Sequence, residues 1–168
     1  QYTAIKKDTT LLVEGYTIED YDTRNAPYEG HYLHSNTKVT KHTKKVHFRE
    51  GDLLIPTRQP GIRYLMETLE PQGADSFFNW NFFDTILQRK EGFSPYVFED
   101  VAIEMLQQDS LLLQEFETKK EAELNFANNW YAQLNWIFER SEHFEEAYMT
   151  YPIYRVAKGS EAAGLLPN

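Results

Sequence analysis

The sequence contains no cysteine, and this absence excludes disulfide bonds, thiolate zinc sites and cysteine nucleophiles. It leaves the cellular compartment open, because many periplasmic proteins also lack cysteine. Long apolar runs are missing too, so we expect no membrane span. No basic and apolar leader opens the chain, which begins at Gln1 in strand-like sequence. We therefore expect an excised segment or a processed product.

The motifs of common catalytic sites are absent as well. Ser76 and Ser94 have no histidine partner in a nucleophile motif, and the sequence has no glycine-rich phosphate loop. His47-Phe-Arg-Glu50 and the later His143 imitate a zinc site of two histidines and a carboxylate, but the pattern His-x-x-Glu occurs often by chance. We predict that this segment is not an enzyme and holds no metal or other cofactor.

Acidic residues are abundant and unevenly placed. The formal net charge is −9, and the stretch from Phe98 to Tyr151 has twelve acidic and three basic residues, which accounts for all of it. Solvated helix faces explain these acids more simply than binding chemistry does, and caps and turns explain the carboxylate pairs that imitate a glycosidase. Residues 37–49 carry five basic residues and no acid. A lysine-protected edge strand fits this stretch better than a phosphate-binding surface, so we expect no nucleic acid partner.

Large aromatic residues crowd the segment from Leu69 to Asp84. Five of its sixteen residues are Phe or Trp, set among carboxylates and amides. Pro71 and Gly73 turn the chain, and the rings that follow are too closely spaced for one helical stripe. We expect these rings to face two neighbours. One is the core of this chain, where Phe83 shares a helical face with Leu87, and the other is a second domain, a ligand or a partner.

Strand-like sequence fills the first third of the chain and returns near its end. The ranges that favour strands are 2–5, 11–18, 28–34, 37–48, 53–55 and 151–156. Residues 20–27 favour a loop, and we expect a hairpin bend near Ser35-Asn36 or near His42-Thr43. These strands predict an antiparallel sheet.

The hydrophobic period changes to that of helices after Pro60. Apolar residues at 62, 65, 66 and 69 predict a helix over residues 61–69. Further helices are expected at 80–88, 95–107, from the capping residue Asp109 onward, and 125–140. We therefore predict an α+β fold, in which an antiparallel sheet from the N-terminal third and a final strand is covered by a helical C-terminal half.

The predicted elements fit a single accessory domain over residues 1–156. Its expected parts are a sheet-rich region at 1–57, a helix-rich region at 60–142 and a return strand at 151–156. Residues 157–168 are predicted to form a tail.

A series of short sequence motifs extends over nearly the whole chain, from about Tyr16 to Arg155. They are Tyr28-Glu-Gly-His31, Phe48-Arg-Glu-Gly-Asp-Leu-Leu-Ile-Pro56, Gln59-Pro60, Leu69-Glu-Pro71, Asp75-Ser76, Trp80-Asn-Phe-Phe-Asp84 and Tyr151-Pro-Ile-Tyr-Arg155. In this order they resemble the region that follows the catalytic domain in bacterial carboxypeptidase A-like zinc metallopeptidases, especially the long proteins of Bacteroidetes-type bacteria.

The resemblance implies a parent protein that removes C-terminal residues from peptides with a zinc ion held in a separate catalytic domain. None of that family's catalytic residues can be placed on this sequence, because His47 and Glu50 lie outside the peptidase's metal motif. The implied role of this chain is a non-catalytic C-terminal domain of a secreted, periplasmic or extracellular protein.

Two functions remain open for such a domain. It either docks on the peptidase domain of the same polypeptide and shapes access to its cleft, or binds peptide, carbohydrate or cell wall through exposed aromatics. We prefer docking, because apolar rings crowd the segment and tyrosine is absent from it. The candidate interface or ligand-binding residues are Trp80, Phe82, Asp84, Glu29 and His31. Of these, Trp80 or Phe82 is the expected anchor, and Asp84 is expected to bind nearby backbone amides.

Overall fold

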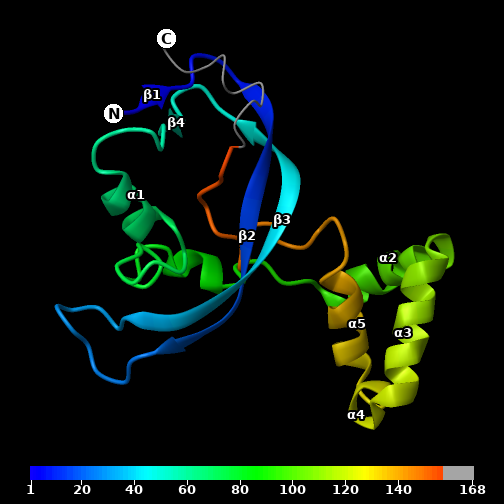
Figure 1. Cartoon of the computed structure of the whole chain (residues 1–168). Coiled ribbons are helices and arrows are strands. Elements are labelled where there is room, and N and C mark those ends of the chain that lie inside the picture. Colours follow the sequence, from blue (N-terminus) through cyan, green and yellow to red (C-terminus); the bar gives the residue numbers. More distant parts are fainter. Residues whose placement is uncertain (157–168) are drawn as a thin grey trace. The chain divides into compact units, whose positions relative to one another are not determined.

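Antiparallel strands occupy the first third of the chain and helices follow them, as the computed structural model describes for residues 1–156 (Figure 1). The strands are β1 (Thr3–Ala4), β2 (Thr9–Thr23), β3 (His34–Phe48) and β4 (Leu53–Leu54). The helices are α1 (Ile62–Leu69), the 3₁₀ helix η1 (Asp84–Leu87), α2 (Pro95–Gln108), α3 (Ser110–Ala122), α4 (Leu124–Ala127) and α5 (Trp130–Phe138). The predicted α+β class is confirmed, and the tail predicted at 157–168 lies outside the described residues.

The chain divides into two compact units. The sheet unit contains Gln1–Gln88 and the chain from Ala147 onward, and the helical unit contains Arg89–Glu146. A single accessory domain was expected over residues 1–156. Helices α2 to α5 enclose a core of their own, whose residues all lie between Phe93 and Phe144.

Strands β2 and β3 form a long, twisted antiparallel ribbon (Figure 1). Each strand has 15 residues, so β2 continues to Thr23 through part of the loop predicted at 20–27. The pairing register shifts near Asn36, whose φ of 53° is left-handed. The bend predicted there is therefore a bulge inside β3. No bend occurs at His42-Thr43, because Glu29-Gly30 makes the hairpin turn instead.

The predicted aromatic segment packs one of its sides against this ribbon. Tyr16 and Ile18 of β2, Phe78, Ile86 and Tyr151 form a buried cluster, and Phe83 and Leu87 pack on it. Phe83 and Leu87 thus share the inward face that was expected, although the predicted helix at 80–88 is only the short η1. Phe82 lies on the other side and is 62% exposed. The prediction that the rings face two neighbours is consistent with this division.

The prediction of a regular return strand at 151–156 is wrong. The chain does come back to β2, where Thr150 pairs with Thr17 and Arg155 pairs with Glu14 in isolated antiparallel bridges. The two pairs differ in register by two residues, and Pro152 between them has no N–H to donate to a ladder. The segment is therefore held at two points and has no continuous ladder.

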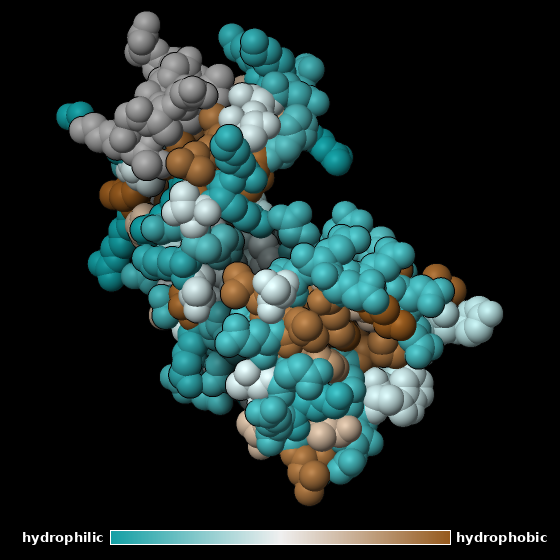
Figure 2. All heavy atoms as spheres, turned by 90° about the vertical axis from the view of Figure 1, so that its right-hand side faces the viewer, coloured by the Kyte–Doolittle hydropathy of each residue, from teal (hydrophilic) through white to brown (hydrophobic). Residues whose placement is uncertain are grey.

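Two helices of the helical unit, α3 and α5, begin at residues whose side chains cap the first turn. Asp109 Oδ1 accepts hydrogen bonds from the backbone N–H groups of Leu111 (2.9 Å) and Leu112 (3.0 Å), as predicted for the start of α3. The helix predicted over 125–140 is divided into α4 and α5, because Asn129 Oδ1 accepts from Ala132 N at 3.0 Å and starts a new helix. Figure 2 looks onto this unit and shows hydrophobic side chains at its surface.

Candidate functional site

The motif Tyr28-Glu-Gly-His31 forms the turn between β2 and β3. Glu29 and Gly30 both have positive φ (49° and 83°), and Tyr28 and His31 exchange backbone hydrogen bonds of 2.9 and 2.8 Å. This geometry is a type I′ turn, in which glycine suits the second central position. The turn brings Tyr28 and His31 directly opposite each other, so that their rings can form one surface.

The aromatic segment brings Trp80 and Phe82 to the same place through a tight loop. Backbone hydrogen bonds join Trp80 N to Ser76 O (3.0 Å) and Phe82 N to Phe77 O (2.9 Å). Between the two rings, Asn81 has a left-handed φ of 63°, a conformation that asparagine tolerates better than most residues. The backbone reversal at Asn81 allows two nearby aromatic side chains to remain at the surface.

The rings of Tyr28, Trp80, His31 and Phe82 form a continuous row, which we call the aromatic surface. Their centroids are separated by 6.1 Å for Tyr28 and Trp80, 5.6 Å for His31 and Trp80, and 5.5 Å for His31 and Phe82. Tyr28 is 51% exposed and Phe82 is 62% exposed, whereas Trp80 and His31 are half-buried. Exposed apolar rings that touch one another are typical of binding surfaces.

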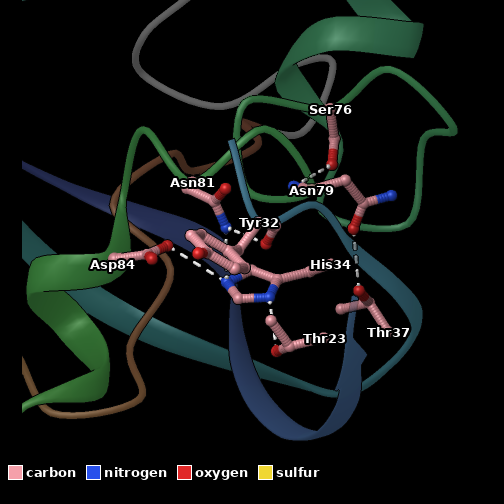
Figure 3. Close-up of polar contacts among 8 residues, drawn as sticks. All are labelled: Thr23, Tyr32, His34, Thr37, Ser76, Asn79, Asn81 and Asp84. Atoms are coloured by element: carbon pink, nitrogen blue, oxygen red, sulfur yellow. Dashed lines mark hydrogen bonds and ion pairs between the residues drawn. The ribbon is translucent and has the colours of Figure 1, made fainter. Parts of the chain in front are cut away.

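A buried histidine connects the loop that carries Trp80 and Phe82 to β2 and β3 (Figure 3). His34 Nδ1 lies 2.9 Å from Thr23 Oγ1, and His34 Nε2 lies 3.1 Å from both Asp84 Oδ1 and Asn81 Nδ2. Asn81 Nδ2 also donates to the carbonyl oxygen of Tyr32 at 2.8 Å. These contacts tie the loop that carries Trp80 and Phe82 to the beginning of β3.

The environment of His34 identifies it as a structural residue. The side chain is buried, and its ring lies 4.6 Å from the ring of Tyr21 and 5.0 Å from the ring of Phe78. Both ring nitrogens lie within hydrogen-bonding distance of protein groups. These contacts orient the loop that carries Trp80 and Phe82.

A second buried polar group fixes the start of the same loop. Thr37 donates its hydroxyl proton to Asn79 Oδ1 at 3.0 Å, and Asn79 Nδ2 donates to the carbonyl oxygen of Gly73 at 2.8 Å. The Ser76 hydroxyl is fully buried, donates to Pro71 O at 3.2 Å and accepts from Asn79 N at 3.0 Å (Figure 3). These bonds fix the backbone of residues 71–79 at the start of the loop.

Two of the motifs that carry the resemblance, Leu69-Glu-Pro71 and Tyr151-Pro-Ile-Tyr-Arg155, meet around Glu70. The Glu70 carboxylate accepts a hydrogen bond from the Tyr16 hydroxyl at 2.8 Å and one from Arg155 Nε at 2.7 Å. The Tyr151 hydroxyl donates to Leu69 O at 2.9 Å. Burial and the hydrogen bond to Glu70 raise the pKa of Tyr16, and burial and the nearby Glu70 charge raise the pKa of Tyr151. Leu69-Glu-Pro71 and the segment near Arg155 thus hold the sheet unit together.

The five predicted site residues differ in position. Trp80, Phe82 and His31 lie together in the aromatic surface. Asp84 lies behind it, and its Oδ1 contacts the His34 ring instead of the backbone amides that were expected. Glu29 occupies an exposed turn position and has a left-handed backbone conformation. Tyr28 was missed as a ring of the surface, although its place opposite His31 in a Glu-Gly turn was a usable signal.

The histidine pattern that imitates a zinc site lies apart from the aromatic surface. His47 Nε2 lies 3.5 Å from Asp8 Oδ2, and both side chains are largely exposed. Within residues 1–156, no group of three or more His, Cys, Asp or Glu side chains is arranged to hold a metal ion. None of the helices in the same part of the chain is long and apolar enough to cross a membrane.

Comparison of the chain with protein-family models, curated protein sequences and solved structures found no match.

Proposed function

We propose that this chain is a non-catalytic C-terminal domain of a secreted zinc carboxypeptidase-like protein, and that it docks on the peptidase domain of the same polypeptide. The parent protein would act in the periplasm or outside the cell, with its zinc ion in the peptidase domain. The parent protein is proposed because the short sequence motifs given above resemble those of this family. The observation that supports docking is the aromatic surface, a row of four partly exposed rings on a hydrogen-bonded support.

The role of each ring in docking follows from its exposure. Phe82 and Tyr28 have more than half of their surface free to enter pockets on a partner. Trp80 is held at its edge, where Nε1 lies 3.4 Å from Asp75 Oδ1, and this contact orients the indole. Rings that are oriented before binding lose little side-chain entropy on association. The surface therefore combines exposed apolar area with preorganisation.

The tilt of the rings favours docking over carbohydrate binding. Neighbouring ring planes are inclined by 60° for Tyr28 and Trp80, 75° for His31 and Trp80, and 48° for His31 and Phe82. A sugar that stacks on two rings needs faces that are close to coplanar. An irregular protein surface can instead accept rings at several angles.

The test begins with the gene upstream of this segment, which should encode a zinc peptidase in the same reading frame. The peptidase domain and this chain are then produced separately, and their association is measured by isothermal titration calorimetry. We expect Phe82→Ala and Trp80→Ala to weaken association by about 30-fold, which corresponds to roughly 2 kcal/mol for an interface anchor. Tyr96→Ala, which removes a 90% exposed ring from the helical unit, is the matched control and should leave the affinity unchanged.

Two results would contradict this proposal. One is a reading frame without a peptidase, and the other is association that both ring variants leave intact. Retention of the chain on insoluble cell-wall glycan, lost in Trp80→Ala, would favour the carbohydrate-binding alternative instead. Urea unfolding of each variant shows whether a change in affinity reflects a loss of folding.

A further inference from the structure

The helical unit has a groove on its surface that takes no part in the proposed docking. Helices α2 and α5 line an open hollow of about 200 Å³. Its apolar lining includes Ala102, Ile103, Leu106, Trp130, Leu134 and Ile137. The lining positions in each helix are spaced i, i+3, i+4 and i+7, starting from residue 99 in α2 and residue 130 in α5. The hollow is therefore a strip between two helix faces, roughly 10 Å long at 1.5 Å per residue.

The groove keeps large apolar side chains in contact with solvent. Trp130 is 63% exposed and Ile103 is 49% exposed, whereas Ile137 beside them belongs to the buried core. The core of the unit is complete without Trp130. A tryptophan that is exposed beside an apolar hollow is the residue type that most often carries binding energy at an interface.

Charge decides what kind of partner fits this groove. Residues 89–146 have thirteen acidic and five basic residues, so −8 of the net charge of −9 belongs to the helical unit. Helix α2 carries Glu99, Asp100 and Glu104 with no basic residue, and in the described part of the chain none of the three has an ion-pair partner. Glu99 itself lines the groove.

This charge disfavours three partners that could otherwise cover an apolar strip. The helical unit of a second copy has the same charge of −8, and anionic lipid and nucleic acid are also negative, so each would be repelled. A cationic partner is attracted instead. An apolar strip between two helices, about two turns long, fits the apolar face of a short amphipathic helix.

We infer that the groove between α2 and α5 binds a basic amphipathic helix of a partner protein. Apolar side chains of that helix enter the strip beside Trp130 and Ile103, and a Lys or Arg side chain faces Glu99, the acidic residue that lines the groove. This interaction is additional to the proposed docking role and uses a different unit of the chain.

The test uses the full chain and a synthetic 15-residue helical peptide. The peptide has Leu at positions 1, 4, 5, 8 and 12 and Lys, Arg or Ala elsewhere, and its binding is followed by fluorescence anisotropy. We expect saturable binding that weakens at least tenfold in Trp130→Ala and severalfold in Glu99→Gln. Glu117→Gln, which makes the same charge change on α3, is the matched control and should bind like wild type. Helical circular dichroism verifies that each variant is folded.

Two control peptides separate recognition from simple charge attraction. A peptide of the same composition, with its Leu residues distributed around the helix, should bind at least tenfold more weakly. A peptide with Glu in place of Lys and Arg should not bind. Equal binding of the scrambled peptide, or unchanged binding by Trp130→Ala, would overturn the inference.

Two further measurements keep this inference separate from the others. Dimerisation in sedimentation experiments that Trp130→Ala abolishes would identify a second copy as the occupant and would also overturn the inference. Phe82→Ala should leave peptide binding intact, because Phe82 lies in the sheet unit. Failure of the peptidase docking experiment therefore leaves this result unaffected, and the reverse is also true.

Discussion

The helical unit is built from one continuous stretch of the chain, whereas the sheet unit joins two stretches that are far apart in the sequence. All residues of the helical core lie between Phe93 and Phe144. In the sheet unit, the bonds from Tyr16 to Glu70, Tyr151 to Leu69 and Arg155 to Glu70 span 54, 82 and 85 residues. The two longest of these separations exceed the length of the whole helical unit, and closing such long loops costs conformational entropy.

This difference determines how each binding surface is supported. The groove on the helical unit is lined by α2, α5 and Phe116 of α3, which all belong to one continuous segment of the chain. The aromatic surface requires β2, β3 and the loop from Leu69 to Asp84 to be in place together. We therefore expect mutations in the buried loop to change the sheet unit and its rings while the helical unit is unaffected.

The largest expected effect comes from Phe78→Ala. Phe78 is fully buried, and its ring lies 5.5 Å from the ring of Tyr21 and 5.0 Å from that of His34. The cavity should lower the free energy of unfolding of the sheet unit by about 3–5 kcal/mol. Hydrogen exchange measured by mass spectrometry reports the two units separately. Phe82→Ala, which removes an exposed ring, should cost less than about 0.5 kcal/mol. Equal loss of protection in both units would show that they unfold as one.

The next effect is that of Tyr16→Phe, which removes the hydroxyl that donates to Glu70. A buried hydrogen bond to a charged group contributes about 1.5–3 kcal/mol, so urea unfolding at pH 7 should show a loss of this size. Tyr64→Phe, at a site that is 66% exposed, is the control and should have no effect. If both variants lose the same stability, the bond to Glu70 does not support the sheet unit.

The same hydroxyl predicts a dependence on alkaline pH. Folding raises the pKa of Tyr16, mainly by burial, so the folded chain holds this proton more tightly than the unfolded chain. The resulting stability is present below the unfolded pKa of about 10 and is lost as the pH rises toward the folded value. Wild-type stability should therefore fall above about pH 10, and more steeply than that of Tyr16→Phe. Parallel curves would contradict this assignment.

Gly73→Ala tests the close backbone approach at the start of the aromatic loop. A Cβ atom at residue 73 would lie 2.3 Å from the carbonyl oxygen of Glu67, so the backbone must move. We expect a loss of about 1–3 kcal/mol in the sheet unit, measured by urea unfolding. Gly92→Ala in the helical unit is the matched control, because a Cβ atom there has nothing within 4 Å. Replacing glycine by alanine lowers the entropy of the unfolded chain and by itself favours folding, so Gly92→Ala should not lose stability. A loss of equal size in both variants would show that the effect at residue 73 does not come from the contact with Glu67.

The two units also differ in how far the sequence predicts them. Helices α1, α2 and α3 could be predicted because their apolar period and the cap at Asp109 are signals within a few neighbouring residues. The break before α5 was missed, because the sequence around Asn129 fits both a helix cap and a position inside a helix. Only the hydrogen bond from Ala132 N shows that Asn129 is a cap.

The aromatic surface could be predicted in part for the same reason. The density of rings from Phe77 to Phe83 is a local signal, and it identified Trp80 and Phe82. The role of His34 was missed, because its partners Asn81 and Asp84 are 47 and 50 residues away in the sequence. The local sequence of a strand does not show whether its histidine is exposed or is buried between two rings.

The smallest effect that tests the comparison is Asp109→Ala in the helical unit. Asp109 Oδ1 accepts from two backbone N–H groups that have no other partner in the first turn of α3. Loss of the cap should cost about 1 kcal/mol, because water can replace part of the interaction. The effect should be confined to hydrogen exchange in α3 and its neighbours, with protection in β2 and β3 unchanged. Asp100→Ala makes the same change of charge on α2, where the described structure gives the carboxylate no capping role, and is the matched control. If Asp109→Ala lowers protection in β2 as much as in α3, the helical unit does not fold independently of the sheet unit, and the distinction between the two units fails.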